Sequence, residues 1–207
     1  MSTARDRILE MLSAGTITAR DAEELLRALG GRKTPFSDWL FHPMTKLETS
    51  QALALAAATA LLQLLVSSLL QIRFDGALDL HQAGETVPWS TALLDLALGW
   101  PVTALILFAV ARPIAGQGRL VDFFSAVGVA RLPNVAGGVL LWVSREFLFG
   151  PPPVPLSVGS IALSLSVLLL GVWFAALLVS GLRAAAGLRG GKLALASIVG
   201  LVAAEAL

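Results

Sequence analysis

The stretch TSQALALAAATALLQLLVSSLLQI, residues 49–72, contains no charged side chain. A second uncharged stretch, FLFGPPPVPLSVGSIALSLSVLLLGVWFAALLVSGL, covers residues 147–182. A helix needs roughly 20 apolar residues to cross a hydrocarbon layer about 30 Å thick. Both stretches are long enough, so the sequence predicts a helical protein that is built into a membrane.

The composition and motifs argue against a soluble enzyme. Charged residues make up only 14% of the chain, whereas soluble domains have about 25%. There is no cysteine, and the chain lacks a phosphate-binding glycine loop, an HExxH and a GxSxG motif. His42 and His81 have no carboxylates at a recognised metal-ligand spacing. We therefore expect no enzyme activity, catalytic residue, metal site or cofactor, and the scattered basic residues do not indicate nucleic-acid binding.

The predicted fold class is all-α, a polytopic membrane helical bundle with about five transmembrane helices. Pro101 should kink or interrupt the second helix. The segment 119–131 is amphipathic, and we interpret it as lying in the interface. Arg145 and Glu146 interrupt the third span, and the fifth span is short. The predicted spans are Ser50 to Gln71, Thr91 to Ala111, Pro133 to Phe149, one helix within 157–182, and Leu193 to Leu207.

The positions of the basic residues predict the orientation. Nine Lys or Arg side chains flank one side of the predicted spans, and two flank the other. Cytoplasmic loops are enriched in Lys and Arg, so we expect the N-terminus in the cytoplasm. The nine are Arg32, Lys33, Lys46, Arg112, Arg119, Arg131, Arg183, Arg189 and Lys192, and the two are Arg73 and Arg145.

The first 31 residues predict a cytoplasmic helical hairpin. Thr18 is a candidate N-cap for its second helix, with Asp21 three residues later. Two helices of this size bury too little surface to be stable alone, so we expect the apolar face to dock on a partner, a second copy or the membrane domain. That face comprises Ile8, Leu12, Leu25, Leu26 and Leu29.

Residues 32–48 predict an amphipathic juxtamembrane segment, because aromatic side chains occur there together with basic ones, as is typical of a membrane interface. The transmembrane domain then covers residues 49–207.

Ionisable residues within membrane spans are costly and indicate functional sites. Asp95 and Arg145 should lie at similar depths near the outer face, and we expect them to approach each other. Glu146 or Glu205 should lie at the same level. This candidate intramembrane polar cluster predicts either an outward pocket for an ion, lipid headgroup or peptide, or an ion pair that only joins two helices.

Small residues repeat every four positions in two predicted spans. Ala56 and Ala60, and likewise Ser160 and Ser164, would let helices approach closely. We expect internal packing, with a homo-oligomer face as the alternative. Trp100 and Trp173 fall within spans, and we expect them to be packing residues.

Several short patterns resemble a known family. They are Phe36, Leu40 and Pro43 before the first span, Arg131-Leu132-Pro133 before the third, Trp173 in the fourth, and Gly181-Leu182-Arg183, Gly187 and Gly191-Lys192 before the fifth. Together with five spans they resemble the Yip domain family of polytopic membrane proteins over residues 36–207. The hairpin, through Ile8 to Leu12, Gly15, Ile17-Thr18 and Glu23 to Leu26, is similar to the short helical domain of some bacterial membrane and envelope-stress proteins.

These resemblances imply a multi-pass protein of the bacterial cytoplasmic (inner) membrane. Eukaryotic family members bind small GTPases in vesicle traffic, a role that a bacterium cannot share, whereas some bacterial members accompany export transporters. We therefore expect a non-enzymatic scaffold or accessory protein that docks a cytoplasmic partner or an export transporter. The alternative is a small transporter or lipid-handling protein. The expected partners are membrane lipids and either another protein or a second copy.

Overall fold

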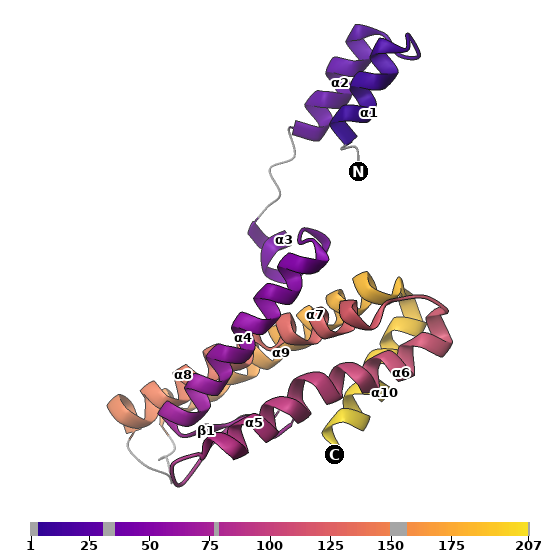
Figure 1. The fold of residues 1–207 in the computed structure, drawn as a ribbon. Coiled ribbons are helices and arrows are strands. Elements are labelled where there is room, and N and C mark those ends of the chain that lie inside the picture. Colours follow the sequence, from indigo (N-terminus) through magenta and orange to yellow (C-terminus); the bar gives the residue numbers. More distant parts are fainter. Residues whose placement is uncertain (1–3, 31–35, 77–78, 150–156, 207) are drawn as a thin grey trace. The chain divides into compact units, whose positions relative to one another are not determined.

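The computed structural model describes residues 4–30, 36–76, 79–149 and 157–206. The chain forms two compact units, Met1–Trp39 and Leu40–Leu207, which divide within helix α3 (Phe36–Phe41) (Figure 1). Sequence reasoning places domain boundaries near residues 31 and 48, and those boundaries stay predictions.

The first unit contains a hairpin of two helices, α1 (Ala4–Ser13) and α2 (Ala19–Gly30). The predicted cap is confirmed, because the Thr18 backbone N–H and hydroxyl donate to Asp21 Oδ2 and the Asp21 N–H donates to Thr18 Oγ1. These hydrogen bonds hold the pKa of the exposed Asp21 carboxyl below its usual value. Ile8 and Ala22 are the side chains buried among the described residues of this unit.

The first membrane helix is α4 (Thr49–Leu70). It is followed by a two-stranded antiparallel hairpin, β1 (Ile72–Arg73) and β2 (His81–Gln82), in which Ile72 pairs with Gln82 and Arg73 with His81. Ile72 and Phe74 are fully buried against the bundle. The loop between the first two spans is therefore packed into the protein.

The second span is a continuous helical segment of three parts: α5 (Trp89–Ala97), the π-helical turn η2 (Leu98–Val102) and α6 (Thr103–Ala115). Pro101 lies inside the π-turn. A proline has no N–H to donate, so the regular hydrogen-bond ladder cannot continue through it. The predicted interruption at Pro101 is confirmed.

The third span begins earlier than predicted. Helices α7 (Leu120–Ala130) and α8 (Leu132–Val143), with the π-helical η3 (Ser144–Phe149), form one apolar segment from Leu120 to Leu148 that is long enough to cross a membrane. Helical hydrogen bonds continue across the junction, since Arg131 N–H donates to Val127 O at 3.2 Å and Val135 N–H donates to Arg131 O at 3.3 Å. The interfacial assignment of residues 119–131 is wrong, because α7 is covered on several sides and buries seven of its eleven residues.

The last two helices are α9 (Val158–Ala186) and α10 (Gly190–Glu205). Within the described residues, four helical segments are long and apolar enough to span a membrane: 49–70, 89–115, 120–148 and 158–186. Helix α10 has 16 residues, fewer than the roughly 20 needed for a full crossing. The predicted all-α membrane bundle is confirmed, and its fifth helix is short, as the sequence indicated.

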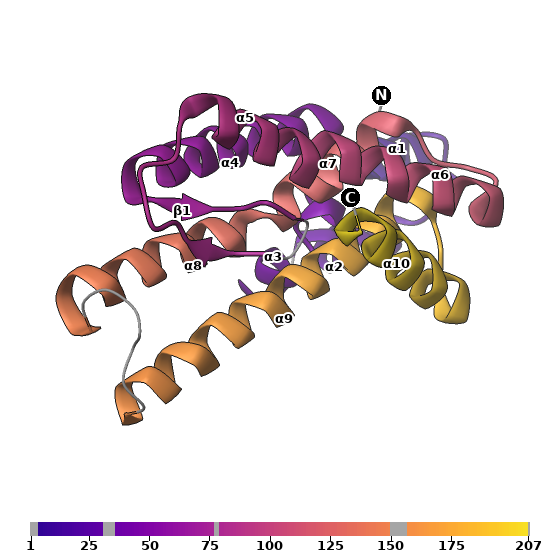
Figure 2. The same cartoon turned by 90° about the horizontal axis from the view of Figure 1, so that it is seen from below.

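Helix α7 lies at the centre of the second unit and packs on α4, α6 and α9 (Figures 1 and 2). Close approach depends on small residues. A Cβ at Gly128 would overlap Ala56 on α4, and one at Gly181 on α9 would lie 2.7 Å from Ala126 Cβ. Ala56 and Ala60 are both buried, so the predicted internal packing is confirmed for that pair.

The first half of α9 runs beside α8 and is otherwise little covered (Figure 2). Its apolar side chains, including Val158, Leu165 and Leu169, are more than half exposed. A lipid-facing surface has this composition. Ser160 and Ser164 lie on this half of α9, and the homo-oligomer alternative stays a prediction there.

The short 3-10 helix η1 (Pro43–Thr45) and the residues before it pack on α9. The Trp173 indole N–H donates to the Leu40 carbonyl at 2.8 Å, and His42 Nδ1 lies 3.1 Å from Ser180 Oγ. Trp100 likewise donates to the Phe124 carbonyl at 2.7 Å. Both mid-span tryptophans are packing residues, as predicted.

Candidate functional site: an arginine inside the bundle

Arg131 is the largest fully buried side chain in the described part of the chain, with 1% of its surface exposed. It lies eleven residues into the third span, about 16 Å along the helix from Leu120. Ionisable groups at such positions are rare and usually functional. Arg131 is therefore the strongest candidate for a functional or structural role inside the bundle.

The guanidinium of Arg131 joins three other segments of the protein. Its Nε donates to Gln63 Oε1 on α4 at 2.8 Å. Its Nη1 donates to the Gly99 carbonyl at 2.7 Å and to the Gly76 carbonyl at 3.2 Å. One side chain thus connects the first span, the second span and the loop between β1 and β2.

The Gly99 carbonyl lies inside the π-turn that contains Pro101. The regular helix ladder is interrupted in this turn, and Arg131 adds a side-chain donor to one of its backbone oxygens. Glycine is also required for space, since a Cβ at position 99 would lie 2.5 Å from Arg131 Nη1. Gly99 and Arg131 therefore act together, and the guanidinium binds the turn that contains Pro101 to the third span.

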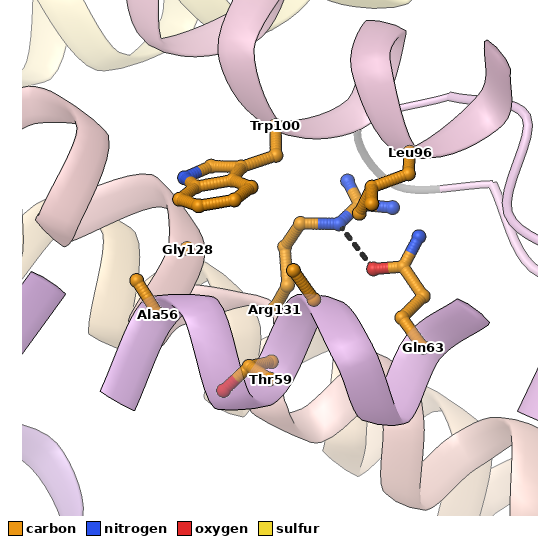
Figure 3. Close-up of a pocket in the computed structure, with 8 residues that line it drawn as sticks. Ala56, Thr59, Gln63, Leu96, Trp100, Gly128 and Arg131 are labelled. Atoms are coloured by element: carbon orange, nitrogen blue, oxygen red, sulfur yellow. Dashed lines mark hydrogen bonds between the residues drawn. The ribbon is translucent and has the colours of Figure 1, made fainter. Parts of the chain in front are cut away.

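The surroundings of Arg131 are closed to solvent. The side chains lining this small space include Thr59, Leu96 and Trp100, and together they leave no water-sized void (Figure 3). Figure 3 shows Arg131 extending from its helix between α4 and the helix that carries Leu96 and Trp100, with a hydrogen bond from its Nε to the Gln63 side chain. The described geometry is that of a packed polar contact between helices.

A second polar group lies at the β1–β2 hairpin. Arg73 forms a two-pronged contact with Asp95 of α5, from Nε to Oδ2 at 3.1 Å and from Nη2 to Oδ1 at 2.9 Å. The Asp95 side chain is 3% exposed and that of Arg73 34%. The hydrogen bond to this carboxylate raises the pKa of Arg73, so its guanidinium stays protonated.

The predicted approach of Asp95 to Arg145 is wrong. Asp95 pairs with Arg73, while Arg145 donates to Gln71 Oε1 at 2.8 Å. The depth in the membrane that the sequence predicts is similar for Arg73 and Arg145, so it could not show which of the two arginines pairs with Asp95. The β-hairpin brings Arg73 back over α5, because it reverses the chain directly after α4.

The other two predicted cluster members lie in different places, Glu146 beside Arg145 and Glu205 against the loop after β1. Glu146 Oε1 lies 3.9 Å from Arg145 Nε and is about half exposed. The Glu205 carboxylate lies against Gly76, where an added Cβ would be 2.7 Å from its Oε1. Asp95, Arg145 and Glu205 thus contact the segment 71–76 through different residues, and they do not form one joint pocket.

The fold also groups His81 with two carboxylates. His81 Nδ1 lies 3.4 Å from Asp75 Oδ1 and 3.7 Å from Asp79 Oδ1, and one ligand atom from each residue falls within 4.8 Å of the others. Sequence reasoning saw no carboxylates at ligand spacing from either histidine. The spacing becomes suitable only because the loop between β1 and β2 turns back on itself.

Sequence reasoning missed Arg131, which was counted among the cytoplasmic charges. One signal could have identified it: residues 120–130 and 132–143 carry no charged side chain apart from Asp122, so Arg131 interrupts a stretch long enough for one span. Pro133 suggested a helix start instead. Helices accept proline in their first turn, but the hydrogen bonds here show that the helix simply continues.

The Arg73–Asp95 pair predicts an asymmetry between two substitutions. Arg73→Gln leaves a buried carboxylate without its charged partner and should cost about 3–5 kcal/mol. Asp95→Asn leaves a partly exposed guanidinium that water can solvate, so about 1–3 kcal/mol is expected. Thermal unfolding of the two variants in the same detergent measures the difference, and a larger loss for Asp95→Asn would contradict this account.

These features define a multi-pass helical membrane protein whose polar interior is used for helix contacts. The comparison with protein families matches residues 38–207 to the Yip1 domain. The chain therefore belongs to the Yip1 domain family, which is not an enzyme family. Residues 5–34 match a SHOCT-like domain, while the likeness to envelope-stress proteins stays a prediction. Neither a curated protein nor a solved structure gives a match.

Proposed function

We propose that this protein is a membrane scaffold or accessory protein without catalytic activity. The bundle anchors it, and the N-terminal hairpin docks a protein partner, such as an export transporter or another cytoplasmic protein. The observation that carries the proposal is the apolar surface of the hairpin. Leu9, Met11 and Leu25 are 44%, 37% and 42% exposed in a unit where only Ile8 and Ala22 are buried among the described residues.

The proposed docking surface differs in part from the face expected from sequence. Ile8 is used inside the hairpin and Leu12 and Leu26 are partly covered, whereas Leu25 is exposed. The side chain of Leu29 lies outside the described residues. An apolar face left open on so small a unit favours association, because the hairpin alone cannot bury enough surface to be stable.

The interior of the bundle favours this function over transport or lipid handling. The Asp95 carboxylate is bound by Arg73, and the residues around Arg131 leave no room for water. A transport pathway needs polar groups that can reach a passing solute. The described polar residues contact protein groups instead, which supports a role in holding the helices together.

We infer a cytoplasmic N-terminus in a bacterial inner membrane. Once Arg131 is placed within the bundle, eight basic residues remain on the proposed inner side against two on the outer side. This excess agrees with the distribution of Lys and Arg in membrane proteins. A tag that is accessible only from outside at the N-terminus would contradict the orientation.

Deletion of residues 1–31 should abolish recovery of the partner from native membranes in mild detergent, while insertion of the bundle is retained. The point variant Leu9→Glu with Leu25→Glu should reduce recovery about tenfold or more, because truncated hot spots cost about 2 kcal/mol. Arg7→Gln with Glu10→Gln, on exposed positions of the same helix, is the matched control. Unchanged recovery in the deletion would rule out docking through the hairpin.

A further inference from the structure

One end of the bundle carries two short loops that contact each other. Residues 116–119 join α6 to α7, and residues 187–189 join α9 to α10. Gln117 Nε2 donates to the Ala186 carbonyl at 3.4 Å. A Cβ at Gly118 would lie 2.9 Å from the Ala185 carbonyl. The ends of four helices therefore form a single surface, which we call the basic end.

Four exposed cations lie on the basic end: Arg112, Arg183, Arg189 and Lys192. Among the described residues, none of the four forms an ion pair within 4 Å. Arg112 lies over the Phe108 ring, 5.2 Å from its centroid, and this contact leaves its charge uncompensated. The basic end thus presents charge that no described carboxylate neutralises.

Two carboxylates close to the basic end form hydrogen bonds of their own. Asp122 binds Arg119 through two oxygens, at 2.9 and 3.0 Å. The Glu48 side chain accepts from the backbone in the first turn of α4, as part of a capping box. Neither acid is placed to compensate the four cations.

The opposite end of the bundle has the reverse charge. It carries five acidic side chains, Asp75, Asp79, Glu85, Glu146 and Glu205, but only two basic ones, Arg73 and Arg145. The two ends therefore differ in sign. The excess of exposed cations is a property of one end, not of the whole surface.

We propose that the basic end binds the headgroups of anionic phospholipids in the leaflet that it faces. Guanidinium groups suit phosphate oxygens, because they offer paired donors at a fixed spacing. All four cations lie within the last turn of a spanning helix or within six residues of its end, which places them near the headgroup layer. The membrane therefore holds a lipid phosphate at the depth where these side chains end. A dissolved anion is not concentrated at that depth, so a lipid headgroup is the favoured ligand.

Thermal unfolding of the full chain in detergent tests the proposal. Phosphatidylglycerol added to the micelles should raise the unfolding temperature by about 5 °C or more at a hundredfold excess over its Kd. Phosphatidylcholine should not. The triple variant Arg183→Gln, Arg189→Gln, Lys192→Gln should lose most of this shift. Arg145→Gln, at the opposite end, should keep it.

Two further arms keep the test decisive if the triple variant does not fold. Arg183→Lys with Arg189→Lys preserves the charge and should retain at least half of the shift. Native mass spectrometry of the unaltered protein should show phosphatidylglycerol bound in preference to phosphatidylcholine. Equal shifts with both lipids, or an undiminished shift in the triple variant, would overturn the proposal. The same shift with inorganic phosphate would assign the surface to soluble anions instead.

Discussion

Replacement of Arg131 by methionine is expected to destabilise the bundle strongly, because it removes the donor shared by three other segments. Methionine fills a similar volume but donates no hydrogen bond. The oxygens of Gln63, Gly99 and Gly76 would then lack their donor in a space too small for water. Each buried acceptor that is left without a donor costs about 1–3 kcal/mol, so the loss of all three contacts should lower the unfolding temperature by about 6 °C or more.

Circular dichroism during heating in detergent measures this loss, and size-exclusion chromatography reports whether the variant stays monodisperse. Arg145→Met is the control, because that side chain is 24% exposed and contacts Gln71 near the end of the bundle. Arg131→Lys should fall between the two, since an ammonium keeps the charge but cannot present the same fork of donors. An Arg131→Met protein as stable as the original would show that the arginine does not hold the helices together.

Gly128→Ala is expected to destabilise the contact between α4 and α7 through overpacking. A Cβ at this position would overlap Ala56 and would lie 2.8 Å from Trp100 Nε1. Ala56 cannot move without its backbone, so α4 and α7 must separate. Overpacking of this kind costs about 1–3 kcal/mol, which corresponds to about 2–12 °C in unfolding temperature.

Gly171→Ala on α9 is the matched control, because nothing lies within 4 Å of the added methyl group. Alanine favours helix over glycine by about 1 kcal/mol, so this variant should unfold at the same temperature or higher. Adding Ala56→Gly to Gly128→Ala removes one of the two overlaps. The double variant should then be less destabilised than the sum of the two single variants, because neighbouring sites are not additive. If the stability losses of the two single variants simply add, the Cβ at position 128 does not overlap Ala56, and this explanation is contradicted.

The helical and membrane character could be predicted from the sequence because it depends on local properties. Length, absence of charge and the 3.6-residue period act within a single segment. The same holds for the Thr18 cap, whose partner is three residues away, and for the interruption at Pro101. Each of these features needs only neighbours along the chain.

The polar contacts could not be predicted in the same way, because each joins residues distant in sequence. Gln63 and Arg131 are 68 positions apart, and Gly99 and Arg131 are 32 apart. Asp95 could be recognised as costly inside a span, but the choice between Arg73 and Arg145 depended on how the β-hairpin folds back. The depth of a residue in the membrane can be estimated from its position along a span. The side of the helix on which its partner lies cannot be estimated in this way.

The amino-acid sequence by itself determined that this chain is a helical membrane protein, where most of its spans lie, and the family to which residues 38–207 belong. Only the tertiary structure decided that the third span includes residues 120–131 and that Arg131 serves the interior. The physical reason is that burial cost follows from local composition, whereas the groups that offset the cost of a buried charge are supplied by other helices. The hydrogen bonds of Arg131 therefore form only when α4, the π-turn and the β-hairpin are assembled around it.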